Sequence, residues 1–153
     1  MTAAIINPFI AATIDTYKRM LFDDAVKPGA PALKKQPAPR YDVSTTIGLS
    51  GKAQGMISIA YSADVAVKTI SAMVGSTIDK DGPDLADGVG EVVNIIAGYA
   101  KKDLVEYALQ ISLPSVIRGD HSITTPSGVP CIVVPFESKY GSFVMEVVLV
   151  TKK

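Results

Sequence analysis

Residues 84–104 read DLADGVGEVVNIIAGYAKKDL, and this stretch decides the fold. Its apolar side chains recur every three or four residues, which predicts an amphipathic helix. With about 100° of rotation per residue, they fall in one broad sector opposite Glu91 and are expected to face the core. The members of this stripe are Leu85, Val89, Val92, Val93, Ile96, Ala100 and Leu104. We expect the longest helix of the chain to run from Pro83 to about Leu109.

The other side of this helix carries polar residues and glycine. Glu91 and Asn94 are three residues apart, so their side chains lie next to each other on the exposed face. Gly98 flattens the surface one turn beyond Asn94, and Ile95 places an apolar side chain at the edge of the patch. Such a face suits close docking of another protein. The alternative is that the polar residues are simply solvated and that Gly98 lets a second helix cross closely.

Three glycines, Gly88, Gly90 and Gly98, stand inside this helix. Each costs about 1 kcal/mol of helix stability relative to alanine. Asn94 is also a poor residue for a helix interior, because its side chain competes with the backbone for hydrogen bonds. These unfavourable residues are a hint that the face has a function.

Two further helices are predicted by local signals. Asn7 is a good N-cap and Pro8 suits the first helical position, so one helix is expected from Pro8 to about Phe22. Ser62 is expected to cap a helix that runs to Val74, where Gly75 ends it. Residues 23–40 hold four prolines and are expected to form an extended surface connection.

Strands are predicted around these helices. The expected strands are Tyr41 to Leu49, Ala53 to Tyr61, Ile111 to Arg118, Cys131 to Glu137 and Ser142 to Thr151. A turn is expected at Gly119-Asp120, and a short loop at 138–141 is expected to join the last two strands as a hairpin. The order indicates an α+β domain over residues 1–153, with helices packed on an antiparallel sheet covered mainly on one side. Each half opens with a long helix and continues into hairpin strands, a loose internal repeat.

Composition excludes several classes of function. Fifteen basic residues balance fifteen acidic ones, which gives no electrostatic attraction to nucleic acid. The single cysteine, Cys131, and the single histidine, His121, argue against a disulfide framework, a multi-cysteine metal site or a Ser-His-Asp triad. No secretory signal or long apolar run is evident, so a cytoplasmic protein without a membrane partner is expected.

The stretch GEVVNIIAGYAKKDL resembles the signature helix of the CheC/CheX/FliY family of chemotaxis phosphatases, which is built around E-x-x-N followed by an A-G-x-A-K run. The matching residues are Glu91, Asn94, Ala97, Gly98, Ala100 and Lys101. INPFIAATIDTYKRML is similar to the first helix of CheX proteins, and ISLPSVIRGD to the strand and turn after their signature helix. The CheC branch carries two motifs. Here the first helix offers only Asp15, with no Asn three residues later, so the resemblance is to CheX.

This resemblance implies a phosphatase that acts on the aspartyl phosphate of a CheY-like receiver domain. Asn94 is expected to orient the attacking water and Glu91 to bind the receiver's lysine. Asp87, Ile95, Gly98 and Lys101 are expected to contact the docked receiver. The chain is expected to need no cofactor of its own, with Mg²⁺ held by the receiver. Family members often dimerise, so a homodimer is a second expected assembly. Tyr99 departs from the family pattern, in which a small polar residue is common.

Two other interpretations stay open at this point. The same fold can serve as a non-catalytic module that docks a receiver or a flagellar-switch component. Alternatively, the chain is a structural domain whose strand Ser142–Leu149 forms an exposed sheet edge and pairs with another chain.

Overall fold

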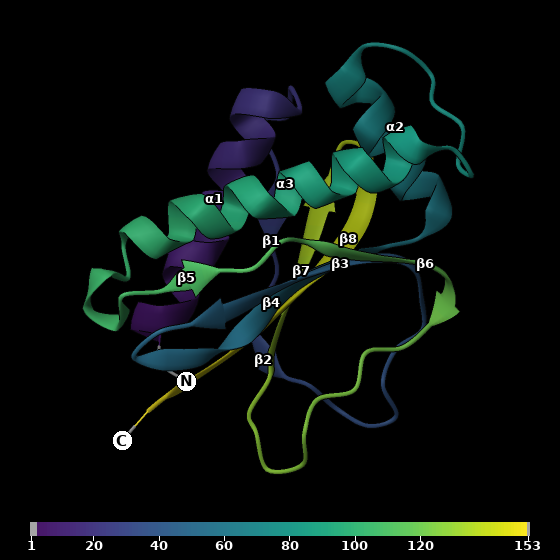
Figure 1. The fold of residues 1–153 in the computed structure, drawn as a ribbon. Coiled ribbons are helices and arrows are strands. Elements are labelled where there is room, and N and C mark those ends of the chain that lie inside the picture. Colours follow the sequence, from purple (N-terminus) through teal and green to yellow (C-terminus); the bar gives the residue numbers. More distant parts are fainter. Residues whose placement is uncertain (1–2, 153) are drawn as a thin grey trace.

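One antiparallel sheet carries three helices on one of its faces in the computed structural model, which describes residues 3–152 (Figure 1). The helices are α1 (Ala3–Met20), α2 (Ala63–Val74) and α3 (Pro83–Lys102), and a 3₁₀ turn covers Val105–Tyr107. The strands are β1 (Lys27–Pro28), β2 (Ala32–Leu33), β3 (Tyr41–Ser50), β4 (Ala53–Tyr61), β5 (Gln110–Ile111), β6 (Ser115–His121), β7 (Ile132–Ser138) and β8 (Gly141–Thr151). The predicted α+β class is confirmed.

The sheet is arranged symmetrically about its centre. Its order is β1-β7-β8-β4-β3-β5, with β2 also paired to β7 and β6 also paired to β3. The hairpins β3–β4 and β7–β8 therefore meet through β4 and β8. The short strands that precede each hairpin pair with the hairpin of the other half. Each half thus consists of a long helix, two short strands and a hairpin, which confirms the predicted repeat.

The core lies between the sheet and the helices. Phe143 of β8 stacks on Tyr17 of α1 at a centroid distance of 4.9 Å, and on Phe136 of β7 at 5.0 Å. The buried Tyr17 and Tyr61 hydroxyls lie 3.1 Å apart and satisfy each other. The predicted apolar stripe of α3 is buried in this core. Helix α3 is therefore anchored along its length by its inner side.

Helix α2 follows the prediction closely. The Ser62 side chain caps its N-terminus by accepting a hydrogen bond from the backbone N–H of Val65 at 3.3 Å. Gly75 ends it in the left-handed conformation with φ 81°. Both caps were expected from sequence, and both are confirmed.

The ends of the other two helices differ from the prediction. Helix α1 begins at Ala3, so Asn7 and Pro8 lie inside it instead of forming its start. The apolar residues Ile5 and Ile6 ahead of the proline are buried, and their packing extends the helix. Helix α3 ends at Lys102 instead of Leu109. The chain turns back there through the 3₁₀ turn.

The strand expected at 111–118 is also different. It is divided into β5 and β6, and Gly119-Asp120 lies within β6 instead of forming a turn. The β3–β6 register shifts between Tyr41 and Val43, and Gly119, with φ 108°, lies at this irregularity. The Gly119-Asp120 pair, which predicted a turn, instead forms an irregularity inside strand β6.

The Pro-rich segment 23–40 does more than connect. It forms β1 and β2 on the edge of β7, and Val26 and Asp23 are buried. The Asp23 carboxylate accepts hydrogen bonds from the backbone N–H groups of Ala25 at 3.0 Å and Lys139 at 2.9 Å. The prediction of a mere surface connection is corrected to that of a partly structural edge.

The sheet face away from the helices holds a buried ionic group that we call the Glu146 cluster: Lys34, Tyr41, Cys131 and Glu146. Lys34 Nζ lies 2.8 Å from Glu146 Oε1 and also donates to the Ile123 carbonyl. The Tyr41 hydroxyl donates to Glu146 Oε2 at 3.0 Å. Burial, with the Glu146 charge beside it, raises the pKa of the Cys131 thiol to about 12. This face is thus partly covered by the segments around Lys34 and Ile123, where sequence predicted cover mainly on one side.

Strand β8 is not an edge. It pairs with β7 on one side and with β4 on the other, including residues 142–149. Its backbone groups are therefore already satisfied, and the hypothesis that Ser142–Leu149 pairs with another chain is wrong. Within residues 3–152, no helix is both long enough and apolar enough to cross a membrane.

Candidate functional site on helix α3

Helix α3 presents its acid and its amide outward. Glu91 and Asn94 are both exposed, while Val92 and Val93 between them are fully buried. A shift of one residue in either direction would bury a polar group, so packing of the valines fixes which side chains face solvent. The exposed pair that the sequence predicted is what the structure shows.

The expected docking residues lie on the same side of α3. Asp87 and Lys101 are exposed, and Ile95 and Gly98 are half-buried. Acidic residues occupy the first half of the helix, and Lys101 and Lys102 its last turn, which complements the helix dipole. The face therefore changes from negative to positive along the helix, with Glu91 and Asn94 between the two ends.

Glu91 differs from the acid on the other long helix. Asp15 of α1 is held by Arg19 at 3.0 Å, whereas the ion pairs formed within residues 3–152 do not include Glu91. An exposed acidic group that has no ion pair among the described residues is available to a cation from a partner.

The three glycines of α3 have three different surroundings. A Cβ added at Gly88 would lie 2.4 Å from Ile70 Cγ2, so this glycine lets α2 pack closely. A Cβ at Gly90 would lie 3.4 Å from Pro114 Cγ. A Cβ at Gly98 would meet nothing within 4 Å. Gly98 therefore serves no helix crossing among residues 3–152, and the open surface predicted beside Asn94 is confirmed.

Tyr99, the departure from the family pattern, points to another flank. It lies about 80° from Glu91 and about 140° from Asn94 around the helix. There it lines a groove between α1 and α3 with Pro8 and Asp15, and Lys102 Nζ lies 5.1 Å from the centre of its ring. The substitution thus changes the α1 side of the helix and leaves the acid–amide pair unobstructed.

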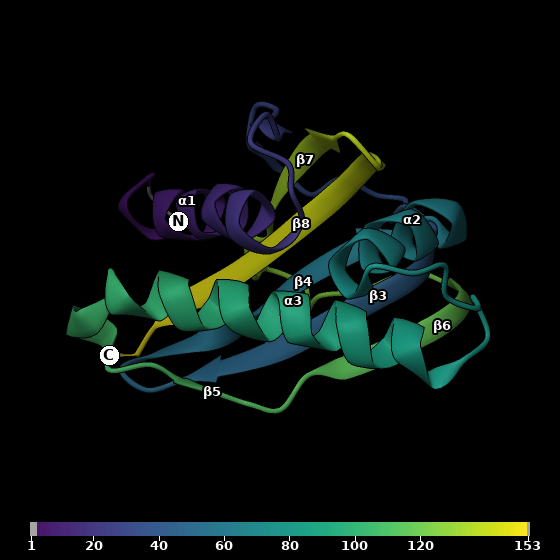
Figure 2. The same ribbon diagram turned by 90° about the horizontal axis from the view of Figure 1, so that it is seen from above.

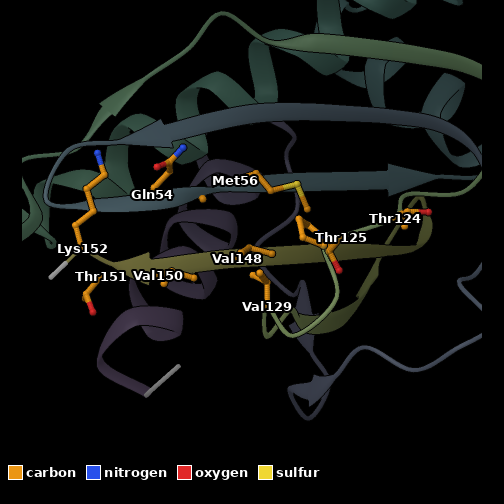
Figure 3. A pocket seen from close by; sticks show the side chains of 11 residues that line it. Gln54, Met56, Thr124, Thr125, Val129, Val148, Val150, Thr151 and Lys152 are labelled. Atoms are coloured by element: carbon orange, nitrogen blue, oxygen red, sulfur yellow. The ribbon is translucent and has the colours of Figure 1, made fainter.

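An apolar pocket lies on the opposite side of the molecule. It is formed by β4, β8 and the loop before β7, with Met56, Val129, Val148 and Val150 in its wall (Figure 3). The helices cover the other face of the sheet, so this pocket has no part in the surface around Glu91. Within residues 3–152, no group of three or more His, Cys, Asp or Glu side chains is placed to hold a metal ion.

Sequence reasoning missed one feature next to the site. The segment Ser112–Pro114, which joins β5 to β6, runs alongside α3 and touches it at Gly90 (Figure 2). Its Leu113 is strongly exposed. The available signal was a large apolar residue directly before a proline, at the end of a short strand.

Comparison with known proteins identifies the family to which this fold belongs. The sequence model of the family described as chemotaxis phosphatase CheX matches residues 43–137. The chain is 27% identical over 122 residues to the CheY-P phosphatase CheX of Thermotoga maritima, and the match covers 78% of each chain. Among solved structures, the chemotaxis protein CheX of Desulfovibrio desulfuricans is similar with a TM-score of 0.86 and 34% identity, over 95% of this chain and 98% of that one.

A third relative was solved together with a partner. It is the CheX of Borrelia burgdorferi, in a CheX-CheY-BeF₃-Mg²⁺ complex, with a TM-score of 0.77 and 27% identity over 97% of this chain and 98% of that one. The fold and the family match agree with one another. This chain belongs to the CheX family of chemotaxis phosphatases, and it is a hydrolase of that class.

Proposed function

We propose that this chain, as one CheX-type domain spanning residues 1–153, hydrolyses the aspartyl phosphate of a CheY-like receiver domain. In this proposal Asn94 orients the attacking water and Glu91 binds the receiver's lysine. The observation that carries it is the exposed, outward-facing pair on a helix whose other side is buried. The relative named CheY-P phosphatase and the solved CheX-CheY complex support the choice of partner.

The amide of Asn94 suits the positioning of water. It donates and accepts hydrogen bonds at the same time, so it can hold a water molecule without repelling the phosphoryl oxygens, as a carboxylate would. The water oxygen forms a bond to phosphorus while the bond from phosphorus to the aspartyl oxygen breaks. The electron pair returns to the aspartate carboxylate, and the proton of the water passes to solvent or phosphate. Phosphoryl transfer of this kind depends mainly on positioning and charge stabilisation.

Glu91 supplies the electrostatic contact. A charge-assisted hydrogen bond to the receiver's lysine is worth about 1.5–3 kcal/mol. Glu91 is free of ion pairs within residues 3–152, so it loses no contact of its own when it binds the lysine. Because Glu91 and Asn94 lie on neighbouring turns, binding of the lysine places the amide over the receiver's site.

The neighbouring residues suit close docking. The open surface at Gly98 lets a partner approach the helix backbone, and Ile95 offers an apolar contact. Asp87 and Lys101 place opposite charges at the two ends of the face, which favours one orientation of the partner. Mg²⁺ would be held by the receiver and would supply charge neutralisation at the phosphoryl group.

The test is the release of phosphate from a phosphorylated CheY-like receiver. Asn94→Ala is expected to lower turnover by about 10²–10³, because it removes one positioned group. Its affinity for a receiver loaded with Mg²⁺ and beryllofluoride, which stands in for the phosphoryl group, should remain close to that of the wild type. Glu91→Ala is expected to lose both affinity and rate.

Asn7→Ala is the matched control. Asn7 is also an exposed asparagine inside a helix, but it lies on α1 and should leave turnover unchanged. Wild-type turnover in Asn94→Ala would rule out the role of Asn94. Binding of the loaded receiver without faster dephosphorylation would instead identify the chain as a non-catalytic docking module.

A further inference from the structure

Leu113 is the most exposed large apolar residue that the structure describes, with 88% of its surface accessible. Single exposed leucines are common and need no explanation by themselves. Leu113 differs because hydrogen bonds hold its segment in place and because the next residue, Pro114, packs against α3 at Gly90, directly before Glu91. Both points follow from the backbone contacts of the Ser112–Pro114 segment.

The segment is fixed by hydrogen bonds to β3. The Ser112 backbone N–H donates to the Gly48 carbonyl at 3.0 Å, and the Gly48 N–H donates to Ser112 Oγ at 2.8 Å. The Ser112 hydroxyl in turn donates to the Leu113 carbonyl at 2.9 Å. Pro114 has a fixed φ and restricts Leu113 to an extended conformation. Leu113 is therefore presented by a rigid segment.

The strand register places Leu113 beside a buried residue of β3, although the Leu113 side chain itself is exposed. Leu49 pairs with Ile111, and Thr46 pairs with Ser115. Two β3 residues, Gly48 and Ile47, thus oppose three residues of the segment. Ser112 is hydrogen-bonded to Gly48, which leaves both Leu113 and Pro114 opposite the single residue Ile47, as in a β-bulge.

Contact with α3 sets the height of Leu113 along that helix. Pro114 packs against Gly90, and the β5–β6 segment runs beside α3 in the opposite direction (Figure 2). An extended chain rises about 3.3 Å per residue and a helix about 1.5 Å. Leu113, which directly precedes Pro114, therefore lies level with the turn of α3 from Glu91 to Asn94. Asn94 is about 40° around the helix from Gly90, on the flank that this segment follows.

We propose that Leu113 is an apolar anchor that the phosphorylated receiver covers when Glu91 and Asn94 engage its site. This inference rests on the proposed function. The proposal requires an apolar patch on the receiver beside the phosphorylated aspartate. Leu113 has no group that can act on water or phosphate, so it sets the affinity for the receiver and leaves the chemical step unchanged.

The experiment compares Leu113→Ala and Leu113→Asp with wild type and with Leu33→Ala. Leu33 is a matched control, because it is also an exposed leucine, at 62%, but lies on β2 at the other edge of the sheet. Steady-state dephosphorylation gives KM and kcat. Binding of a CheY-like receiver loaded with Mg²⁺ and beryllofluoride gives Kd.

Leu113→Ala is expected to raise KM and Kd about tenfold, the order of magnitude for removing most of a leucine side chain that binding would bury. Leu113→Asp should raise both further, because it places a charge in the interface. The expected change of kcat is within about twofold for both, and Leu33→Ala should match the wild type throughout. Thermal unfolding of all variants should stay at the wild-type temperature, because both leucines are exposed.

The outcomes separate this inference from the proposed function. Wild-type KM and Kd in both Leu113 variants, together with an inactive Asn94→Ala, would overturn the anchor and leave the phosphatase site intact. A wild-type chain that binds the loaded receiver without dephosphorylating it would overturn the proposed reaction, while Kd still reports on Leu113. A chain that does not bind the receiver at all would overturn both.

Discussion

The two faces of the sheet are covered in contrasting ways. On one face α1, α2 and α3 enclose an apolar core with stacked aromatic rings. On the other face the Pro-rich segment and the loop before β7 meet at the buried Lys34–Glu146 ion pair. The helical side can present functional groups outward because its inner side is fully packed. The loop side contains the buried ion pair, which bears on stability, so substitutions on the two faces should have separable effects.

The largest loss of folding free energy is expected for a substitution in the buried ion pair of the loop-covered face. Glu146→Ala leaves Lys34 buried without its partner, and such losses cost about 3–5 kcal/mol of folding free energy. The free energy of unfolding in urea measures this. The phosphatase activity of the protein that remains folded should be unchanged, because α3 packs on the other face.

The Asp15–Arg19 pair is the control for that variant. It is exposed, so Arg19→Ala should cost less than about 1 kcal/mol. Replacing both members of the buried pair, by Lys34→Met with Glu146→Leu, should recover part of the lost stability, because no charge is left buried, although the Tyr41 hydroxyl loses its acceptor. A loss of activity in folded Glu146→Ala would show that the two faces are coupled.

A smaller effect is expected inside the helical layer. Gly88→Ala adds a methyl group 2.4 Å from Ile70 Cγ2. Ile70 is fully buried and β-branched, so it cannot move aside cheaply, and overpacking of this kind costs about 1–3 kcal/mol. The better helix propensity of alanine offsets up to about 1 kcal/mol of that. A lowered midpoint of thermal unfolding is the expected result, and an unchanged midpoint would mean that α2 shifts freely on α3.

The smallest change in stability, and of opposite sign, is expected for the same substitution ten residues later. Gly98→Ala meets nothing within 4 Å, so it should stabilise the fold by up to about 1 kcal/mol through helix propensity alone. If the receiver approaches α3 at this point, KM for the phosphorylated receiver should rise even though the protein is more stable. Greater stability with an unchanged KM would remove Gly98 from the docking surface.

Local signals were sufficient for part of the fold. The stripe of α3 and the Ser62 and Gly75 caps of α2 depend on residues within a few positions of each other, and all were predicted. Features that depend on contacts between segments distant in the sequence were not predicted. Segment 23–40 forms strands because it pairs with the edge of β7. Asn7-Pro8 lies within a helix because the preceding residues, Ile5 and Ile6, are buried in the core.

The candidate site divides in the same way. The outward position of Glu91 and Asn94 follows from the helical period, so the sequence predicts it, and the family resemblance suggests their roles. Leu113 was missed because its position depends on how β5 and β6 each align with β3. That register is a property of the assembled sheet, and no run of neighbouring residues encodes it.

The burial of the inner side of α3 has a consequence for heat inactivation. Neither Glu91 nor Asn94 lies on a loop that can open by itself, and the valines between them belong to the main core. Local opening of loops should therefore occur well before this pair is disturbed. Activity should persist on warming until the fold melts as a whole, and it should return when the fold does.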